Sequence, residues 1–208
     1  MKSGADIPVC LSAKPTIMIT FSKLDLRQAA YRNACPTAKL SNMNLTDHDT
    51  AIMRLALEQA QAAAEVGEVP VGAVVYRGDE ILATAHNMRE HWADPTAHAE
   101  LIALRDAAKK IGTWRLDGCR LAVTLEPCPM CAGALVNSRL DAVVYGITDP
   151  NMGCVESLHS LLDTEAFNHR VHWQGGVLAD ECLAVLQAFF KARRGANKPP
   201  KPTPNQTP

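Results

Sequence analysis

The segment LDAVVYGIT, residues 140–148, is an almost unbroken apolar run that lies between polar segments. Its hydrophobic residues do not alternate with polar ones, and the run is far shorter than the roughly 20 residues that a membrane-spanning helix needs. Such a run is typical of a strand that is buried on both faces of a sheet. The sequence therefore predicts a sheet that is covered on both sides.

The segments around this strand alternate between helical and extended patterns. Apolar residues with helical spacing predict helices, and β-rich runs predict strands, two of which form a hairpin at Gly78 and Asp79. The expected order is a helix over 46–66, hairpin strands within 69–87, a loop over 87–96, a helix over 97–112, a strand over 120–126, a helix over 127–139, the strand over 140–148, a short strand over 171–173 and a helix over 180–194. This order predicts an α/β protein, a three-layer α/β/α sandwich with a mixed five-stranded sheet.

The two ends of the chain lack these patterns. Residues 1–44 show neither a helical period nor an alternation, and residues 195–208 are polar and rich in proline. We expect a poorly ordered N-terminal extension over 1–44, one folded domain over 45–194 and a disordered tail over 195–208. Met43 stands just ahead of the first helix and is a candidate natural start, with a targeting role for the extension as the alternative.

Composition limits the compartment and the partners. Seven cysteines in 208 residues are too few, and odd in number, for a secreted disulfide scaffold, so we expect a reducing compartment, the cytoplasm. No apolar stretch is long enough for a membrane helix, so no membrane partner is expected. The formal net charge is −1, so a nucleic-acid partner would have to bind through a local basic patch.

Two short motifs carry the residue types of a metal site. His98 and Glu100 stand in PTAHAE, and Cys128 and Cys131 follow in EPCPMC. One imidazole and two thiolates leave the fourth position of a tetrahedral zinc ion open for water, as in catalytic zinc sites. Because two thiolates neutralise the ion and weaken its effect on the acidity of that water, Glu100 would supply the base.

A closed structural zinc site and a redox-active cysteine pair are the alternatives. A lone C-x-x-C pair is compatible with redox chemistry, and a closed site would need a fourth ligand such as Cys119, Cys154 or His86. A closed structural site requires four protein ligands, whereas the catalytic site requires three.

The catalytic interpretation also makes geometric predictions. Cys128 should precede a helix whose first residue is Pro129, where the missing N–H costs nothing. Residues two apart in a helix point about 200° from each other, so His98 and Glu100 can address one metal only at the first turn. Thr96 or Ala97 should therefore mark the start of that helix.

The order H-x-E followed by P-C-x-x-C is the pattern of zinc deaminases. The segments EVPVGAVV, DPTAHAE, TLEPCPMCAGAL, FNHRV and FFKARR extend the match over about residues 47–194. On these motifs the chain resembles the bacterial tRNA-specific adenosine deaminase family. The resemblance implies a cytidine-deaminase-like fold, a homodimer, one Zn²⁺ per subunit on His98, Cys128 and Cys131, and deamination of the wobble adenosine in the tRNA anticodon stem-loop to inosine. Glu100 would then be catalytic, carrying a proton from water to N1 of the adenine.

Further residues are candidates for substrate contacts. By the resemblance, Asn87 matches a pocket asparagine, and Asp149 would contact the ribose or shape the RNA channel. Arg170, Arg193 and Arg194 are candidate phosphate contacts. Ordinary structural roles compete with these assignments, because Asn87 and Asp149 suit turns and Arg193 and Arg194 suit a solvated helix face.

Two other functions would use the same zinc residues. A deaminase of a free base or nucleotide, of the guanine or cytosine type, would differ only in its substrate. A noncatalytic zinc module would need a fourth protein ligand. A comparison of activity on tRNA with activity on a free base distinguishes a tRNA deaminase from the first alternative. The number of protein ligands distinguishes a catalytic site from the second.

Overall fold

The computed structural model describes residues 47–196, in which helices and strands alternate in the predicted order. The elements are α2 (Asp47–Glu65), β1 (Gly72–Arg77), β2 (Glu80–His86), α3 (Ala99–Ile111), β3 (Arg120–Leu125), α4 (Pro129–Asn137), β4 (Ala142–Ile147), the short 3₁₀ helix η2 (Leu161–Asp163), β5 (His172–Gln174) and α5 (Ala179–Ala196). The sequence did not predict η2, whose three residues are too few for a periodic pattern.

The predicted extension over 1–44, including the candidate start at Met43, lies outside the described residues. So does the predicted tail from residue 197 onward. Helix α5 continues through residues 195 and 196, which the sequence analysis had placed in the tail.

The five strands form one mixed sheet in the order β2-β1-β3-β4-β5. Strand β1 is antiparallel to both β2 and β3, whereas β4 is parallel to β3 and to β5. The predicted hairpin joins β1 to β2, and Gly78 at its turn has a φ of 55°, a conformation that favours glycine. The predicted mixed five-stranded sheet is confirmed.

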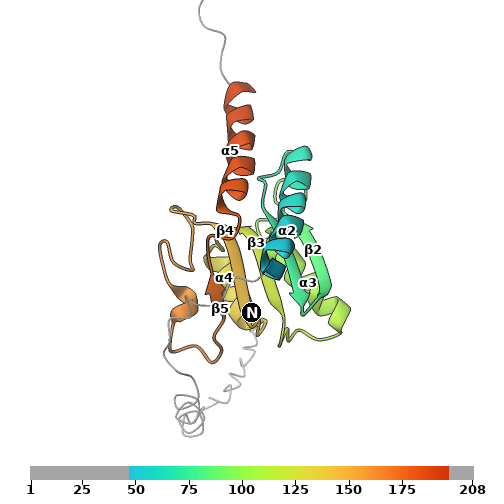
Figure 1. Ribbon diagram of the computed structural model, residues 1–208, viewed down its shortest axis with the longest axis vertical. Coiled ribbons are helices and arrows are strands. Elements are labelled where there is room, and N and C mark those ends of the chain that lie inside the picture. Colours follow the sequence, from blue (N-terminus) through green and yellow to red (C-terminus); the bar gives the residue numbers. More distant parts are fainter. Residues whose placement is uncertain (1–46, 197–208) are drawn as a thin grey trace, which may run out of the picture. The chain divides into compact units, whose positions relative to one another are not determined.

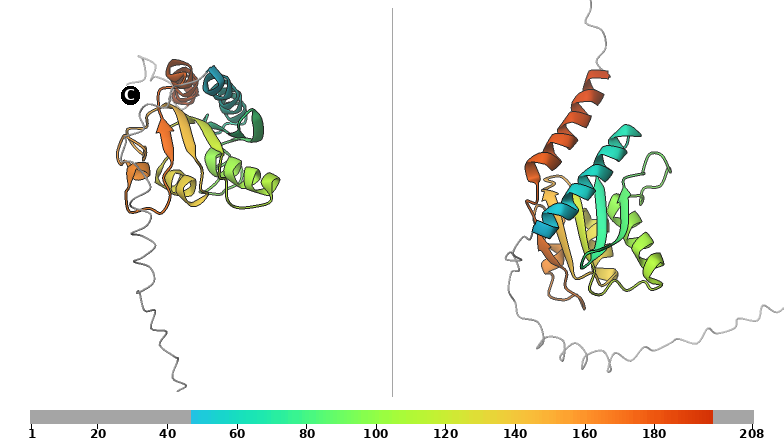
Figure 2. Two further views of the ribbon diagram at one scale, coloured as in Figure 1. Left: turned by 60° about the horizontal axis from the view of Figure 1, so that its bottom comes forward. Right: turned by 45° about the vertical axis from the view of Figure 1, so that its right-hand side comes forward.

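Helices cover both faces of this sheet, as predicted. Helices α2 and α5 pack on one face, where they also contact each other, and α3 and α4 lie on the other (Figures 1 and 2). Two apolar clusters fill the spaces between the layers. Strand β4 has side chains in both clusters, with Val143 and Tyr145 in one and Val144 in the other, so the apolar run at 140–148 is buried on both faces.

A buried ion pair fastens α2 to the sheet. Asp49, which is fully buried, accepts a hydrogen bond from the Tyr76 hydroxyl at 2.8 Å and lies 2.9 Å from the Arg120 guanidinium. The guanidinium also lies over the Tyr76 ring. These contacts join the first turn of α2 to β1 and β3 through charge as well as packing.

None of the helices between residues 47 and 196 is long and apolar enough to span a membrane. Cys119, Cys154 and Cys182 are buried, as expected for cysteines that serve as small apolar residues.

Candidate active site

The chain segments that carry the predicted site meet at one edge of the sheet. His86 at the end of β2 pairs with Gly72 at the start of β1, and Ala73 pairs with Val123 near the end of β3. Because β4 is parallel to β3, it ends at the same edge. The loops that follow β2, β3 and β4 therefore leave the sheet side by side, and they carry the predicted residues up to Asp149.

The two cysteines stand at the start of α4, as predicted. Cys128 is the residue just before the helix, with an extended backbone, and Pro129 is the first helical residue. Cys131 lies one turn into the helix and is fully buried. The spacing of three residues places both sulfurs on the same side of the helix start, where backbone N–H groups favour thiolate over thiol.

The start of α3 differs from the prediction. The helix begins at Ala99, not at Thr96 or Ala97, because residues 94–98 form tight turns held by the Asp94 side chain, which accepts the Thr96 N–H at 2.7 Å. His98 precedes the helix with φ −78° and ψ 148°. Because the backbone of His98 is extended and not helical, the 200° separation of two residues in a regular helix does not apply to His98 and Glu100. Both side chains can therefore face the same metal ion.

His98, Cys128 and Cys131 form a group that could hold a metal ion. The His98 Nδ1 atom lies 3.7 Å from Cys128 Sγ and 3.6 Å from Cys131 Sγ. A tetrahedral zinc ion with bonds of about 2.0 Å to nitrogen and 2.3 Å to sulfur would place these atoms about 3.6 Å apart. The distances from the His98 nitrogen to the two sulfurs therefore fit a zinc ion, and all three ligand atoms lie within 4.8 Å of one another.

No other His, Cys, Asp or Glu of residues 47–196 joins this group. The candidates for a fourth ligand lie elsewhere, with His86 Nδ1 next to the Gln59 side chain at 3.3 Å and Cys119 and Cys154 buried in the core. In the described part of the chain, the candidate group therefore has three members, which is the number of protein ligands that catalytic zinc sites use.

The members of this group shift one another's pKa values. Hydrogen bonds from Cys131 and His98 lower the pKa of Cys128 to about 4, and the hydrogen bond with Cys128, together with burial, raises the pKa of Cys131. The hydrogen bond with Cys128 also raises the pKa of His98. The lowered pKa favours the thiolate form of Cys128, which is the form that binds a metal ion.

Glu100 lies beside this group on the first turn of α3 and is only 4% exposed. Burial raises the pKa of its carboxyl group, the negative charge of Cys128 adds to that rise, and the positive charge of His98 opposes it. A buried carboxyl group with a raised pKa suits proton transfer near neutral pH.

Asn87 is buried at the start of the loop after β2, and its amide is held by Glu68, which was not among the predicted site residues. Its Nδ2 atom donates to Glu68 Oε2 at 3.0 Å, and Glu68 Oε1 accepts the His91 backbone N–H at 2.7 Å. Glu68 is 1% exposed. The only sequence signal for Glu68 is its place in EVPVGAVV, four residues before the buried strand β1.

Asp149 follows β4 in a loop that is held by Glu126, a second carboxylate that was not among the predicted site residues. Asp149 Oδ1 accepts the backbone N–H groups of Asn151 and Met152, so its side chain also closes its own turn. Its backbone N–H donates to Glu126 Oε2 at 2.9 Å. Burial opposes ionisation of Glu126, but the hydrogen bonds from Glu156, Ser157 and Asp149 outweigh it and lower the pKa of this carboxyl group.

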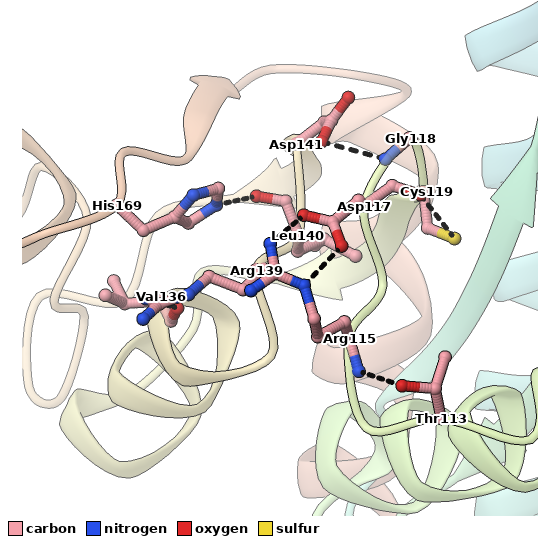
Figure 3. Close-up of polar contacts among 10 residues, drawn as sticks. All are labelled: Thr113, Arg115, Asp117, Gly118, Cys119, Val136, Arg139, Leu140, Asp141 and His169. Carbon is pink, nitrogen blue, oxygen red and sulfur yellow. Dashed lines mark hydrogen bonds and ion pairs between the residues drawn. The ribbon is translucent and has the colours of Figure 1, made fainter.

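Arg170 does not join the other site residues. It lies just before β5, whose first residues pair with the start of β4, at the edge of the sheet opposite Cys128. The chain segments at that edge are joined by polar contacts (Figure 3). Asp141 accepts the Gly118 N–H at 3.0 Å, His169 Nε2 donates to the Leu140 carbonyl at 2.6 Å, and Arg115 pairs with Asp117.

Arg193 and Arg194 are exposed in the last turns of α5, whose C-terminal half extends beyond the sheet (Figure 1). The Arg193 guanidinium lies 5.3 Å from the centre of the Phe189 ring. Phe189 is buried and Phe190 is exposed, as expected for a helix in which only one of the two is in the core. The structure thus presents these arginines to solvent without a carboxylate partner among the ion pairs of residues 47–194.

Comparison with known proteins assigns this fold and site to a class. The model of the MafB19-like deaminase family matches residues 46–194, which include the whole candidate site. A tRNA-specific adenosine deaminase of Bacillus subtilis is 49% identical over 150 residues, which are 72% of this chain and 93% of that protein. The corresponding enzyme of Aquifex aeolicus is 45% identical over 142 residues, 68% of this chain and 93% of that protein.

A solved structure agrees with these relatives. A structure from studies of A-to-I editing by tRNA:A34 deaminases is 38% identical, with a TM-score of 0.64, and the match covers 66% of this chain and 99% of that chain. The protein belongs to the tRNA-specific adenosine deaminase family, and its fold is cytidine-deaminase-like. The resemblance inferred from the five sequence segments is confirmed.

Proposed function

We propose that this protein hydrolytically deaminates the wobble adenosine of tRNA to inosine, with a zinc ion held by His98, Cys128 and Cys131. The observation that carries the proposal is a three-ligand metal group with the buried Glu100 beside it. The identity of 49% with a tRNA-specific adenosine deaminase, over 93% of that protein, supports the choice of substrate.

The reaction replaces the amino group on C6 of adenine by oxygen, so that adenosine and water give inosine and ammonia. Zinc, when bound, would supply the Lewis acid that activates water at neutral pH. Glu100 takes a proton from the water, holds it on its carboxyl group, and delivers it to N1 of the purine. Burial raises the pKa of Glu100 and so stabilises the protonated form between the two transfers.

Asn87 would recognise the purine edge. Since its Nδ2 atom donates to Glu68, its Oδ1 atom remains as an acceptor of known orientation, with one N–H still free to donate. Asp149, at the same edge of the sheet, would contact the ribose or shape the path of the RNA. These two residues would orient the nucleotide while the metal group and Glu100 act on it.

Phosphate contacts would come from outside this pocket. Arg193 and Arg194 offer exposed guanidinium groups on α5, and Arg170 offers one at the far edge of the sheet. Such contacts position an RNA without reading its sequence. Arg170 would touch nucleotides remote from the reacting base, because it lies across the sheet from Cys128.

We further propose that the deaminase domain spans residues 45–194, acts as a homodimer, and works in the cytoplasm. The family resemblance supports the dimer. The two cysteine ligands support the compartment, because they bind metal as thiolates and need reducing conditions.

The test is direct detection of inosine. The purified full chain would be incubated with an anticodon stem-loop bearing adenosine at the wobble position, and the nucleosides analysed by mass spectrometry. A stem-loop with guanosine at that position is the control for the site of reaction. Conversion of free guanine, cytosine or their nucleosides, with the stem-loop unchanged, would instead establish the free-base or nucleotide alternative.

A further inference from the structure

The carboxylate of Glu126 joins the turn that carries Cys128 to the loop that carries Asp149. Glu126 directly follows β3, is only 2% exposed, and its backbone N–H donates to the Ile147 carbonyl at the end of β4 at 2.8 Å. The side chain therefore starts from a fixed point between the ends of two central strands. Neither the ligand set nor the proton transfer uses it.

Both oxygens of this carboxylate are occupied by the loop over 149–157. Oε1 accepts the backbone N–H groups of Val155, Glu156 and Ser157 at 3.0, 2.8 and 3.0 Å. Oε2 accepts the Asp149 N–H at 2.9 Å and the hydroxyl of Ser157. A single side chain thus accepts five hydrogen bonds, so all of the roughly four lone-pair sites of its carboxylate are in use.

The rest of the loop is built around the same group. A Cβ atom on Gly153 would overlap the Glu126 carboxylate, so only glycine fits there. The Cys154 N–H donates to the carbonyl of Pro127 at 2.9 Å, one residue before Cys128. The Tyr145 hydroxyl donates to Glu156, which ties the loop to β4 as well.

The loop presents its other side toward solvent with features that suit a partner. Met152 in the loop is 54% exposed and Leu158, which directly follows the loop, is 50% exposed, although both are large and apolar. Asp149 lies in the same loop. Of its two carboxylate oxygens, only Oδ1 accepts the backbone N–H groups of Asn151 and Met152. A loop that is so firmly held from inside can meet a substrate without first becoming ordered.

We propose that Glu126 is a positioning residue for the substrate: it holds the 149–157 loop, with Asp149, in a fixed place against the turn that carries Cys128. The inference rests on the proposed function, because it needs RNA to contact this loop. Only a carboxylate can fill the role, since all five groups that face it are donors. An amide in its place would turn an NH₂ group toward at least one of these N–H or O–H groups.

The test compares Glu126→Gln with the parent and with Glu165→Gln, which removes an exposed carboxylate farther along the same connection. Zinc content, hydrogen exchange of the backbone amides, and kcat and KM on the anticodon stem-loop would be measured on the full chain. We expect Glu126→Gln to keep its zinc, to exchange the amides of 149–157 faster, and to raise KM about tenfold with a smaller change in kcat. Glu165→Gln should match the parent.

The outcomes separate this inference from the function on which it rests. An inactive parent would overturn the proposed function and the inference with it. An active parent, together with unchanged KM or unchanged exchange in Glu126→Gln, would overturn the inference alone. Loss of zinc would also overturn it, by showing that Glu126 supports the metal group and not the placement of the substrate loop. If Glu126→Gln does not fold, Ser157→Ala removes one of the five donors, and the same rise in KM, smaller in size, decides the question.

Discussion

The Nδ1 atom of His98 lies 3.7 Å from the Sγ atom of Cys128, although 30 residues separate them in the chain. Each residue stands immediately before a helix, His98 before α3 and Cys128 before α4. The N-terminal ends of the two helices therefore meet at the candidate metal group, where their unpaired N–H groups stabilise negative charge. Thiolates and the carboxylate of Glu100 are the groups that gain from this arrangement.

Replacing Glu100 by glutamine should separate metal binding from turnover. Glu100→Gln keeps the shape of the side chain and leaves the three ligands intact, so zinc content should equal that of the parent. Turnover should fall by about 10²- to 10⁴-fold, which is the usual contribution of a positioned general acid and base. Glu58→Gln, an exposed carboxylate on α2, is the matched control. A Glu100→Gln protein with the parent's turnover would contradict the assigned role.

Replacing a ligand should remove the metal without unfolding the chain. Cys128→Ala and His98→Ala should each lose most of their zinc, because a site with two ligands binds far more weakly than one with three. The secondary structure should remain, since the two apolar clusters form without the metal group. Zinc analysis and circular dichroism would check both points. Cys119→Ala, a buried cysteine outside the group, should retain its zinc.

Chelation should act in the same way on the parent protein. Removing zinc should abolish deamination and lower the midpoint of thermal unfolding, because the metal binds the folded chain and not the unfolded one. Adding zinc back should restore both. Recovery of activity without added metal would show that the reaction does not depend on the group formed by His98 and the two cysteines.

The buried ion pair between α2 and the sheet predicts a large loss of stability. Asp49→Ala would leave the Arg120 guanidinium and the Tyr76 hydroxyl without their buried acceptor. Breaking such a pair by removing one partner typically costs about 3 to 5 kcal/mol of the free energy of unfolding. Urea unfolding would measure this cost. Asp47→Ala, an exposed residue of the same helical turn, should change stability by less than about 0.5 kcal/mol.

The fold was predictable because each element has a strong local pattern. The apolar run at 140–148, the periodic helices and the glycines at 78 and 112 were sufficient to order the elements, and Gly112 ends α3 with a φ of 82° as expected. The start of α3 was predicted two or three residues too early. The turns at 94–98 depend on hydrogen bonds to the side chain and the backbone carbonyl of Asp94, which a periodic pattern does not contain.

The parts of the candidate site that the sequence did not reveal are those made by distant donors. The metal ligands were recognisable because their spacing is itself chemical information. Glu68 and Glu126 look like ordinary acidic residues, and their roles depend on N–H groups 19 to 31 residues away. The separation of Arg170 from the other residues follows from the parallel register of β4 and β5, which no single segment encodes.

The last turns of α5 offer the clearest test of how a chain with a net charge of −1 holds RNA. Arg193 and Arg194 are exposed, and the sequence from Phe189 onward contains lysines and arginines but no acidic residue. If this end of α5 binds phosphates, replacing both arginines by glutamine should weaken binding of an anticodon stem-loop regardless of its sequence. The zinc content should not change, because the predicted ligands lie at the starts of α3 and α4 and not on α5.

Salt dependence distinguishes phosphate contacts from a solvated helix face. Each lost phosphate contact should reduce the slope of log affinity against log salt by about one unit, so the double variant should lose up to about two. Replacing Lys109 and Lys110 by glutamine removes the same charge from α3, on the opposite face of the sheet, and should leave the slope near that of the parent. Binding would be measured at several salt concentrations for all three proteins. Equal slopes for the parent and the Arg193 and Arg194 double variant would refute the phosphate contacts, because a charge that only solvates the helix releases no counterions from RNA.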